Sequence, residues 1–207
     1  MFSLRQIATY GCLALAVAYA SAVTDKATGI TFKPRIGEKE AIGAGVRKKG
    51  PIKVYSVALY AAASLKERLS ALSASREKKE ALLSLSQGAG SDEPVTFLLN
   101  MNFKVGAEKM AKAISEAVAP RHKGAQSEVD ELESLIFKGV EKKGAATKGT
   151  TMQFDCDETG VSVSVDESSQ GRVDSDGLGC AFCEVYLDDN SVSQALRQNC
   201  IENWCME

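Results

Sequence analysis

The sequence predicts an α+β fold, in which a layer of helices covers one face of a large antiparallel sheet as in an open-faced sandwich. Two observations lead to this prediction. Strand-like and helix-like segments follow one another in the order strands, helix, strand, two helices, strand pair, two helices. Of the 207 residues, 44% are hydrophobic and 25% charged, which is ordinary for a globular protein and sufficient for a sizeable core. No internal repeat divides the chain, and its length suits a single domain.

The first part of the domain contains three short strands and a helix. Strands are expected at ITFKPRI (30–36), EAIGAGVRK (40–48) and PIKVYSVALYA (51–61), the last of which is rich in β-branched and aromatic residues. The intervening KKGP favours a turn. Residues 62–86 are rich in helix formers and have leucines at helical spacing, and 86–94 is expected to be a loop.

The middle of the chain contains a further strand and two helices. In VTFLLNMNF (95–103) the apolar side chains alternate and share one face. Helices are expected at 106–119, where Pro120 ends the helix, and at 127–140, which opens with a Ser–x–x–Asp capping pattern. The composition of 141–150 predicts a mobile linker.

The last part of the chain predicts a hairpin followed by two helices. TTMQFDCD (150–157) and GVSVSVD (160–166) alternate on either side of a short turn. A loop is expected next, and helices are expected at 177–189 and 191–204. In this architecture a ligand would lie between the sheet and the helix layer.

Residues 1–22 are typical of a secretory signal peptide. Arg5 precedes an apolar run over 7–20, and Ala20-Ser21-Ala22 has the small–x–small pattern of a signal-peptidase site. The run is shorter than a spanning helix needs, although an uncleaved membrane anchor is the alternative. We therefore expect the mature domain to be 23–207, without a membrane span. The protein would be secreted or, in an alga with secondary plastids, carried onward to the plastid.

Charge is distributed unevenly along the domain. Residues 23–154 contain 22 basic and 15 acidic residues, whereas 155–207 contain 2 basic and 12 acidic residues. Such asymmetry can mark an interaction surface, but two solvated faces are the simpler interpretation. The overall net charge of −2 does not suggest a nucleic-acid partner.

The cysteines do not form a recognisable framework. After the leader the chain has Cys156, Cys180, Cys183, Cys200 and Cys205, an odd number. The Cys180-x-x-Cys183 spacing occurs in redox and zinc sites, but there is no second such pair. Buried thiols in an apolar helix are therefore favoured, and the disulfide state stays open. We expect no metal site.

Motifs for several enzyme classes are missing. The sequence contains no Walker motif, no GxSxG and no GxGxxG, so we expect no cofactor. The one histidine, His122, lies in the polar break APRHKG, where we expect a solvated loop side chain rather than a catalytic group.

Several motifs resemble those of the chalcone isomerase fold family. They are Gly43-Ala44-Gly45-Val46-Arg47, the strand from Lys53 to Tyr60, Gly171-Arg172-Val173-Asp174-Ser175, Val185-Tyr186-Leu187, and Ser191-Val192-Ser193. Their order and spacing carry the resemblance over about 28–196. It implies a large antiparallel sheet and a helical layer that enclose an apolar cleft. Family members either isomerise chalcones to flavanones or bind fatty acids without catalysis.

The positions of the isomerase's catalytic groups differ here. The resemblance places Lys109 at the catalytic tyrosine, Glu116 at the asparagine, Tyr55 at the threonine and Gly179 at a further Ser/Thr position; Arg47 alone is kept. Loss of such hydrogen-bonding groups removes orders of magnitude of rate. The resemblance therefore favours non-catalytic binding of a fatty acid or similar amphiphilic carboxylate. An intramolecular lyase with altered active-site residues is the alternative.

Arg47 is the candidate anchor for the ligand's head group, because a carboxylate in an apolar cleft needs a cation and hydrogen bonds. Gly43, Ala44 and Gly45 raise the question of whether small residues leave a cavity open beside it. Tyr55 is the first candidate partner and Tyr60 the second; they lie on opposite faces of one strand, so we expect at most one of them to face the cleft with Arg47. Candidate wall residues are Phe97, Leu99, Met101, Met110 and Ile114, with ordinary core packing as the alternative. We expect a monomer.

Overall fold

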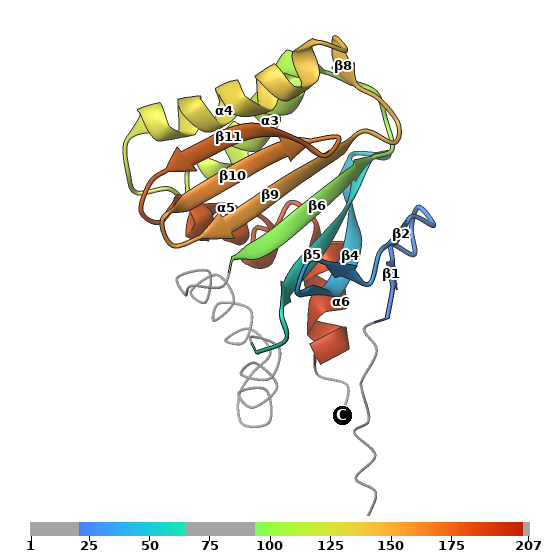
Figure 1. Cartoon of the computed structure of the whole chain (residues 1–207). Coiled ribbons are helices and arrows are strands. Elements are labelled where there is room, and N and C mark those ends of the chain that lie inside the picture. Colours follow the sequence, from blue (N-terminus) through green and yellow to red (C-terminus); the bar gives the residue numbers. More distant parts are fainter. Residues whose placement is uncertain (1–20, 65–93, 205–207) are drawn as a thin grey trace, which may run out of the picture.

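The computed structural model describes residues 21–64 and 94–204, which form a curled antiparallel sheet with helices packed against it (Figure 1). The sheet has seven strands in the order β11-β10-β9-β6-β5-β4-β3. These are β3 (Arg35–Ile36), β4 (Lys39–Lys49), β5 (Ile52–Ala62), β6 (Val95–Met101), β9 (Thr151–Asp157), β10 (Gly160–Val165) and β11 (Ser168–Asp174). Two short ladders join β1 (Val23–Thr24) to β2 (Thr31–Phe32), and β7 (Val105–Gly106) to β8 (Ala145–Ala146).

The helices of the described residues pack on one face of this sheet, which confirms the predicted fold class. They are α3 (Ala107–Val118), α4 (Gln126–Glu141), α5 (Leu178–Leu187) and α6 (Gln194–Trp204). Side chains from all four belong to one core cluster with alternate residues of the strands. In β9, for example, Met152, Phe154 and Cys156 are fully buried and the residues between them are not. This period of two is what one covered sheet face requires.

The opposite face of the sheet is partly covered by the segment that contains β1 and β2. Phe32 packs there with Ala44, Ala58 and Tyr60 in a second apolar cluster. Asp25, which is 2% exposed, fastens the segment by accepting a hydrogen bond from the Ser56 hydroxyl at 2.6 Å. Because that carboxylate is buried, its hydrogen bonds are what make its position tolerable.

Gly43 and Gly45 seat α6 directly on β4. A Cβ at Gly45 would overlap the backbone of Ala195 and Leu196, and one at Gly43 would lie 2.9 Å from the Sγ of Cys200. The space that these residues leave is thus filled by a helix and does not open a cavity beside Arg47. The tight run of small residues is explained by close backbone approach.

The clearest error of the sequence analysis is β11, which was expected to be a loop. Of its seven residues only Val173 is buried, so the segment carries almost no hydrophobic alternation. It forms a strand because it pairs with β10, in register Val161↔Val173. The turn between them places Asp166 and Glu167 at positive φ; aspartate is common in such turns, whereas Glu167 is not a typical residue there. The predicted linker also contains β8.

Some of the predicted segments lie outside the described residues, and one predicted strand has different bounds in the structure. The signal peptide, most of the helix over 62–86, the loop that follows it, and Cys205 lie outside. The strand expected over 30–36 is divided into β2 and β3. No described helix is long and apolar enough to cross a bilayer.

Within the described part of the chain the four cysteines are free thiols. Cys156, Cys183 and Cys200 are completely buried in the core, whereas Cys180 is partly exposed. Burial raises the pKa of the Cys200 thiol and, together with a contact from Cys183, that of Cys156. Neither thiol is therefore activated, because nucleophilic cysteines have lowered pKa values.

The seating of α6 generates a test. Replacement Gly45→Ala forces a methyl group into the helix backbone, and we expect it to lower the free energy of unfolding by about 3 kcal/mol. Gly106→Ala is the matched control, because a Cβ there meets nothing within 4 Å; we expect a loss of at most about 1 kcal/mol. Urea unfolding followed by circular dichroism measures both. Equal stability of the two variants would contradict the proposed contact.

Candidate functional site

The candidate site centres on Arg47, which the β4–β5 ladder places directly opposite Tyr55. The guanidinium Nη1 donates a hydrogen bond to the Tyr55 hydroxyl at 3.3 Å, and Cζ lies 5.7 Å from the centre of the tyrosine ring. The two side chains share the sheet face on which the helices pack. Arg47 is partly buried and Tyr55 is 1% exposed.

The third member of the site is Tyr186, which comes from α5. Its hydroxyl lies 2.9 Å from that of Tyr55. The Tyr186 ring stacks on Phe97 at 4.8 Å between ring centres, and Phe182 packs against both rings. This aromatic packing holds the hydroxyl in place, and such pairs add stability beyond their buried area.

The three side chains contain more hydrogen-bond donors than acceptors. Arg47 can only donate, and of its five N–H groups one forms a hydrogen bond with a described residue, namely with the Tyr55 hydroxyl. Whichever tyrosine donates in the hydroxyl pair, the other hydroxyl proton has no acceptor among the described side chains. No described carboxylate forms an ion pair with Arg47 either. The group is therefore complementary to an acceptor that carries negative charge.

Burial and mutual contact set the ionisation of these groups. Burial lowers the pKa of Arg47, but the interactions with Tyr55 and Tyr186 outweigh it and leave that pKa raised, so the cation is retained. Burial is also the main cause that raises the pKa of Tyr186, with the Tyr55 contact adding to it. At neutral pH the site thus presents the positive charge of Arg47 beside the protonated hydroxyl of Tyr186.

Tyr60, the second candidate partner, lies on the opposite face of β5. It belongs to the second apolar cluster, and its hydroxyl donates to the backbone carbonyl of Lys33 at 3.0 Å. The structure therefore brings Tyr55 to Arg47 and keeps Tyr60 away from it. The choice depends on strand register, since neighbouring odd and even positions of β5 face opposite sides.

The candidate wall residues are close-packed in this structure. Each of them is at most 2% exposed, and all belong to the core cluster between sheet and helices; they are Phe97, Leu99, Met101, Met110 and Ile114. Phe97 touches Tyr186. In this structure these side chains therefore pack as ordinary core residues and do not line an open cleft.

The residues at the positions of the isomerase's catalytic groups do not gather around Arg47. Lys109 and Glu116 are exposed on α3. At Gly179 a Cβ would overlap the backbone carbonyl of Asp157, so this glycine allows α5 to pack tightly on the end of β9. Of these positions, only Tyr55 contributes a polar side chain next to Arg47.

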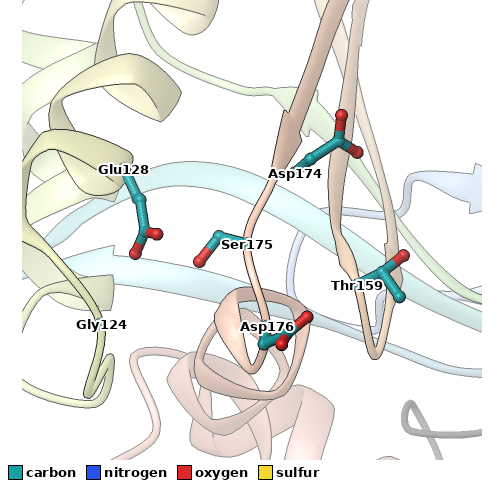
Figure 2. Close-up of a pocket in the computed structure, with 6 residues that line it drawn as sticks. All are labelled: Gly124, Glu128, Thr159, Asp174, Ser175 and Asp176. Atoms are coloured by element: carbon teal, nitrogen blue, oxygen red, sulfur yellow. The ribbon is translucent and has the colours of Figure 1, made fainter.

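A separate hollow of about 610 Å³ opens at the far end of β9 (Figure 2). It is lined by Gly124, Glu128, Thr159, Asp174, Ser175 and Asp176. Figure 2 shows the Glu128 and Ser175 side chains directed toward one another. Neither Arg47 nor a residue of the tyrosine pair lines this hollow, which is polar and acidic.

His122 packs beside this hollow, so the expectation of a solvated histidine was wrong. Its side chain is 2% exposed, and Nε2 lies 2.5 Å from Oε2 of Glu128. His122 lies in the connection between α3 and α4. Hydrogen bonds from His122 and then Ser175 lower the pKa of the Glu128 carboxyl. Since Nε2 faces both Glu128 and Ser175, and Nδ1 has no partner among the described side chains, the trio does not form a relay for nucleophilic catalysis.

Comparison with known proteins identifies the class. The family model described as chalcone isomerase-like matches residues 40–201, so the chain belongs to the chalcone isomerase-like family. Among solved structures, the chain is similar to the Arabidopsis thaliana fatty-acid binding protein AtFAP1, with a TM-score of 0.71 and 22% identity. That match covers 89% of this chain and 98% of the other. No curated protein sequence matches the chain.

The sequence analysis missed Tyr186 as a member of the site. The residue was noted only as part of the Val185-Tyr186-Leu187 motif at the end of a helix. A polar hydroxyl within an otherwise apolar helix was the available signal, because a buried tyrosine hydroxyl usually has a hydrogen-bond partner. Its partner could not be named without the placement of α5 against β5.

The raised pKa values of the buried tyrosines predict that the free energy of unfolding falls at alkaline pH. Burial raises the pKa of Tyr60 to about 12, whereas in the unfolded chain a tyrosine ionises near pH 10. The stabilisation is present below about pH 10 and is lost as the pH rises to about 12, by about 2 to 3 kcal/mol for this group. Urea unfolding across this range should show a smaller decline in Tyr60→Phe. Some decline will remain, because the pKa of Tyr186 is also raised. An identical decline in both proteins would contradict the assignment.

Proposed function

We propose that the protein binds a fatty acid, or a similar amphiphilic carboxylate, without catalysing a reaction. In this proposal Arg47 and the hydroxyls of Tyr55 and Tyr186 receive the carboxylate. The observation that carries the proposal is the excess of donors around a partly buried arginine with no described carboxylate partner. A carboxylate accepts several hydrogen bonds at once and matches the planar guanidinium.

Flexible side chains in the core beside the site could make room for the acyl chain of the ligand. Met101, Met110 and Met152 lie in the same core cluster as Tyr55 and Tyr186. Methionine side chains are flexible and fill irregular spaces, so they can repack around a methylene chain. We propose that the chain inserts between the sheet and α5 as these side chains repack.

The likeness to AtFAP1 is consistent with this proposal, since that protein is described as a fatty-acid binding protein. The shared fold alone would not distinguish binding from catalysis. Lys109 and Glu116 are exposed on α3 and do not lie beside Arg47, so neither can orient a reacting substrate there. This favours binding over catalysis.

Titration with laurate and palmitate tests the head-group assignment. We expect Arg47→Gln to weaken binding about tenfold or more, because a charge-assisted hydrogen bond is lost. Tyr186→Phe should weaken it several-fold. Lys48→Gln, at the exposed neighbouring position, is the matched control and should change affinity by less than about twofold. Circular dichroism checks that each variant is folded.

Lipid extraction and mass spectrometry of the purified protein provide a second readout. We expect fatty acids to co-purify with the wild type and to be depleted from Arg47→Gln. The absence of bound lipid together with no laurate or palmitate binding would overturn the proposal. Wild-type affinity in Arg47→Gln would reject the head-group role alone.

We also propose that residues 1–22 direct the chain into the secretory pathway and are removed after Ala22. The leader's composition supports this, with Arg5 ahead of an apolar run and a small–x–small cleavage pattern. N-terminal sequencing of protein recovered from expressing eukaryotic cells should begin at Val23. A fusion that lacks 1–22 should stay in the cytosol. A recovered chain that retains residues 1–22 would contradict cleavage.

A further inference from the structure

Three loops meet at the end of the sheet where β4 leads into β5. They are the β4–β5 turn, the connection from β6 to β7, and the segment that enters β9, and Figure 1 shows them at the same end of the sheet. The backbone N–H of Phe103 donates to the carbonyl of Val54 at 3.1 Å, and that of Gly149 donates to Met101 at 2.9 Å. These bonds hold the three loops side by side.

This end of the molecule is positively charged without compensation. Each loop contributes exposed lysines, which are Lys48, Lys49, Lys53, Lys104 and Lys148; we call them the basic end. No acidic residue occurs within 43–54, 101–107 or 145–150. None of the five lysines forms an ion pair with a described carboxylate, although Lys53 donates to the carbonyl of Ala27 at 2.5 Å.

Two large apolar side chains project from the same loops. Ile52 is 41% exposed and Phe103 is 50% exposed. Among the described residues, only one other large hydrophobic side chain is exposed to this degree, Phe137 on α4. Phe137 differs in its surroundings, since it lies in hollows lined by carboxylates such as Glu133 and Glu141. Ile52 and Phe103 thus differ from Phe137 in that lysines, and not carboxylates, lie around them.

The opposite end of the sheet carries the opposite charge. Strand β9 runs from the basic end to the hollow of Figure 2, which is lined by Glu128, Asp174 and Asp176 together with Thr159. The seven residues of β9 span about 20 Å. The basic end and the carboxylate-lined hollow therefore lie at opposite ends of the sheet, and beside the hollow Arg172 pairs with Asp157 and Asp174.

We propose that the basic end docks on an anionic lipid membrane. The lysines contact lipid phosphates, and Ile52 and Phe103 insert among the head groups. Unpaired lysines are attracted to the negative surface potential of anionic lipids, and apolar side chains add burial that a purely electrostatic contact lacks. A nucleic acid would offer the phosphates but no apolar layer for these two side chains.

The docking surface adjoins the candidate ligand site. Arg47 immediately precedes Lys48, and Tyr55 lies two residues beyond Lys53 on the returning strand. A molecule docked in this way brings the carboxylate-binding group to the membrane interface, where fatty acids have their head groups. This use in exchanging fatty acid with the membrane rests on the proposed function, whereas the docking itself does not.

Vesicle sedimentation with the mature domain tests the proposal. We expect binding to phosphatidylcholine vesicles that contain about one third phosphatidylglycerol, and little binding to pure phosphatidylcholine. Salt at about 0.5 M should weaken it. The charge reversal Lys48→Glu/Lys49→Glu should reduce binding about tenfold. Phe103→Ser, which keeps every charge, should reduce it several-fold.

Matched variants separate this surface from general effects. Lys112→Glu/Lys123→Glu makes the same charge change on exposed residues outside the basic end, and Phe137→Ser removes an exposed aromatic ring elsewhere. Both should bind vesicles as the wild type does. Arg47→Gln should keep most vesicle binding even if it loses fatty acid, so failure of the proposed function would leave this result intact.

Several results would overturn the docking proposal. They are equal binding to neutral and anionic vesicles, equal losses in the surface variants and their controls, and no effect of Phe103→Ser. Binding to duplex DNA without binding to vesicles would assign the surface to a different polyanion. Self-association in the absence of lipid, abolished by Lys48→Glu/Lys49→Glu, would assign it to a second copy of the chain.

Discussion

The close contact between α6 and β4 is the constraint on which the candidate site depends. Because Gly45 has no side chain, the backbone of α6 rests on the strand, and the Ser193 hydroxyl at its start donates to the carbonyl of Val46 at 3.0 Å. In the preceding turn the Ser191 hydroxyl donates to the carbonyl of Tyr186 at 2.7 Å. The position of α6 thus sets the end of α5, and with it the place where the Tyr186 hydroxyl meets Tyr55.

The site that results has a charge without a counter-charge among the described residues, and its surroundings make this charge tolerable. The guanidinium of Arg47 is only partly buried, lies near the Tyr55 ring and donates a hydrogen bond to its hydroxyl. A fully buried arginine without a partner would be strongly unfavourable. Partial exposure allows solvent to stabilise the Arg47 cation and leaves its N–H donors available to an anion. The packed aromatic cluster beneath it holds the tyrosines in one geometry.

The candidate ligand site and the basic end share a structural origin in the β4–β5 hairpin. The paired strands of the hairpin present Arg47 and Tyr55 to the interior, and its turn presents lysines and Ile52 to the outside. The two proposed functions, one inside and one outside, are separated by only a few residues because side chains alternate in direction along a strand. The lack of acidic residues in all three loops at this end keeps their charge unneutralised.

The sequence by itself determined most of the elements and the α+β class and singled out Arg47 as the candidate anchor, because these depend on local periodicity and on residue chemistry. It did not predict β11, whose strand conformation comes from pairing with β10 rather than from its own side chains. Only the tertiary structure decided that Tyr55 rather than Tyr60 lies with Arg47, that His122 is buried, and that Tyr186 completes the group. Those outcomes depend on strand register and helix placement, which arise from contacts between segments far apart in the chain.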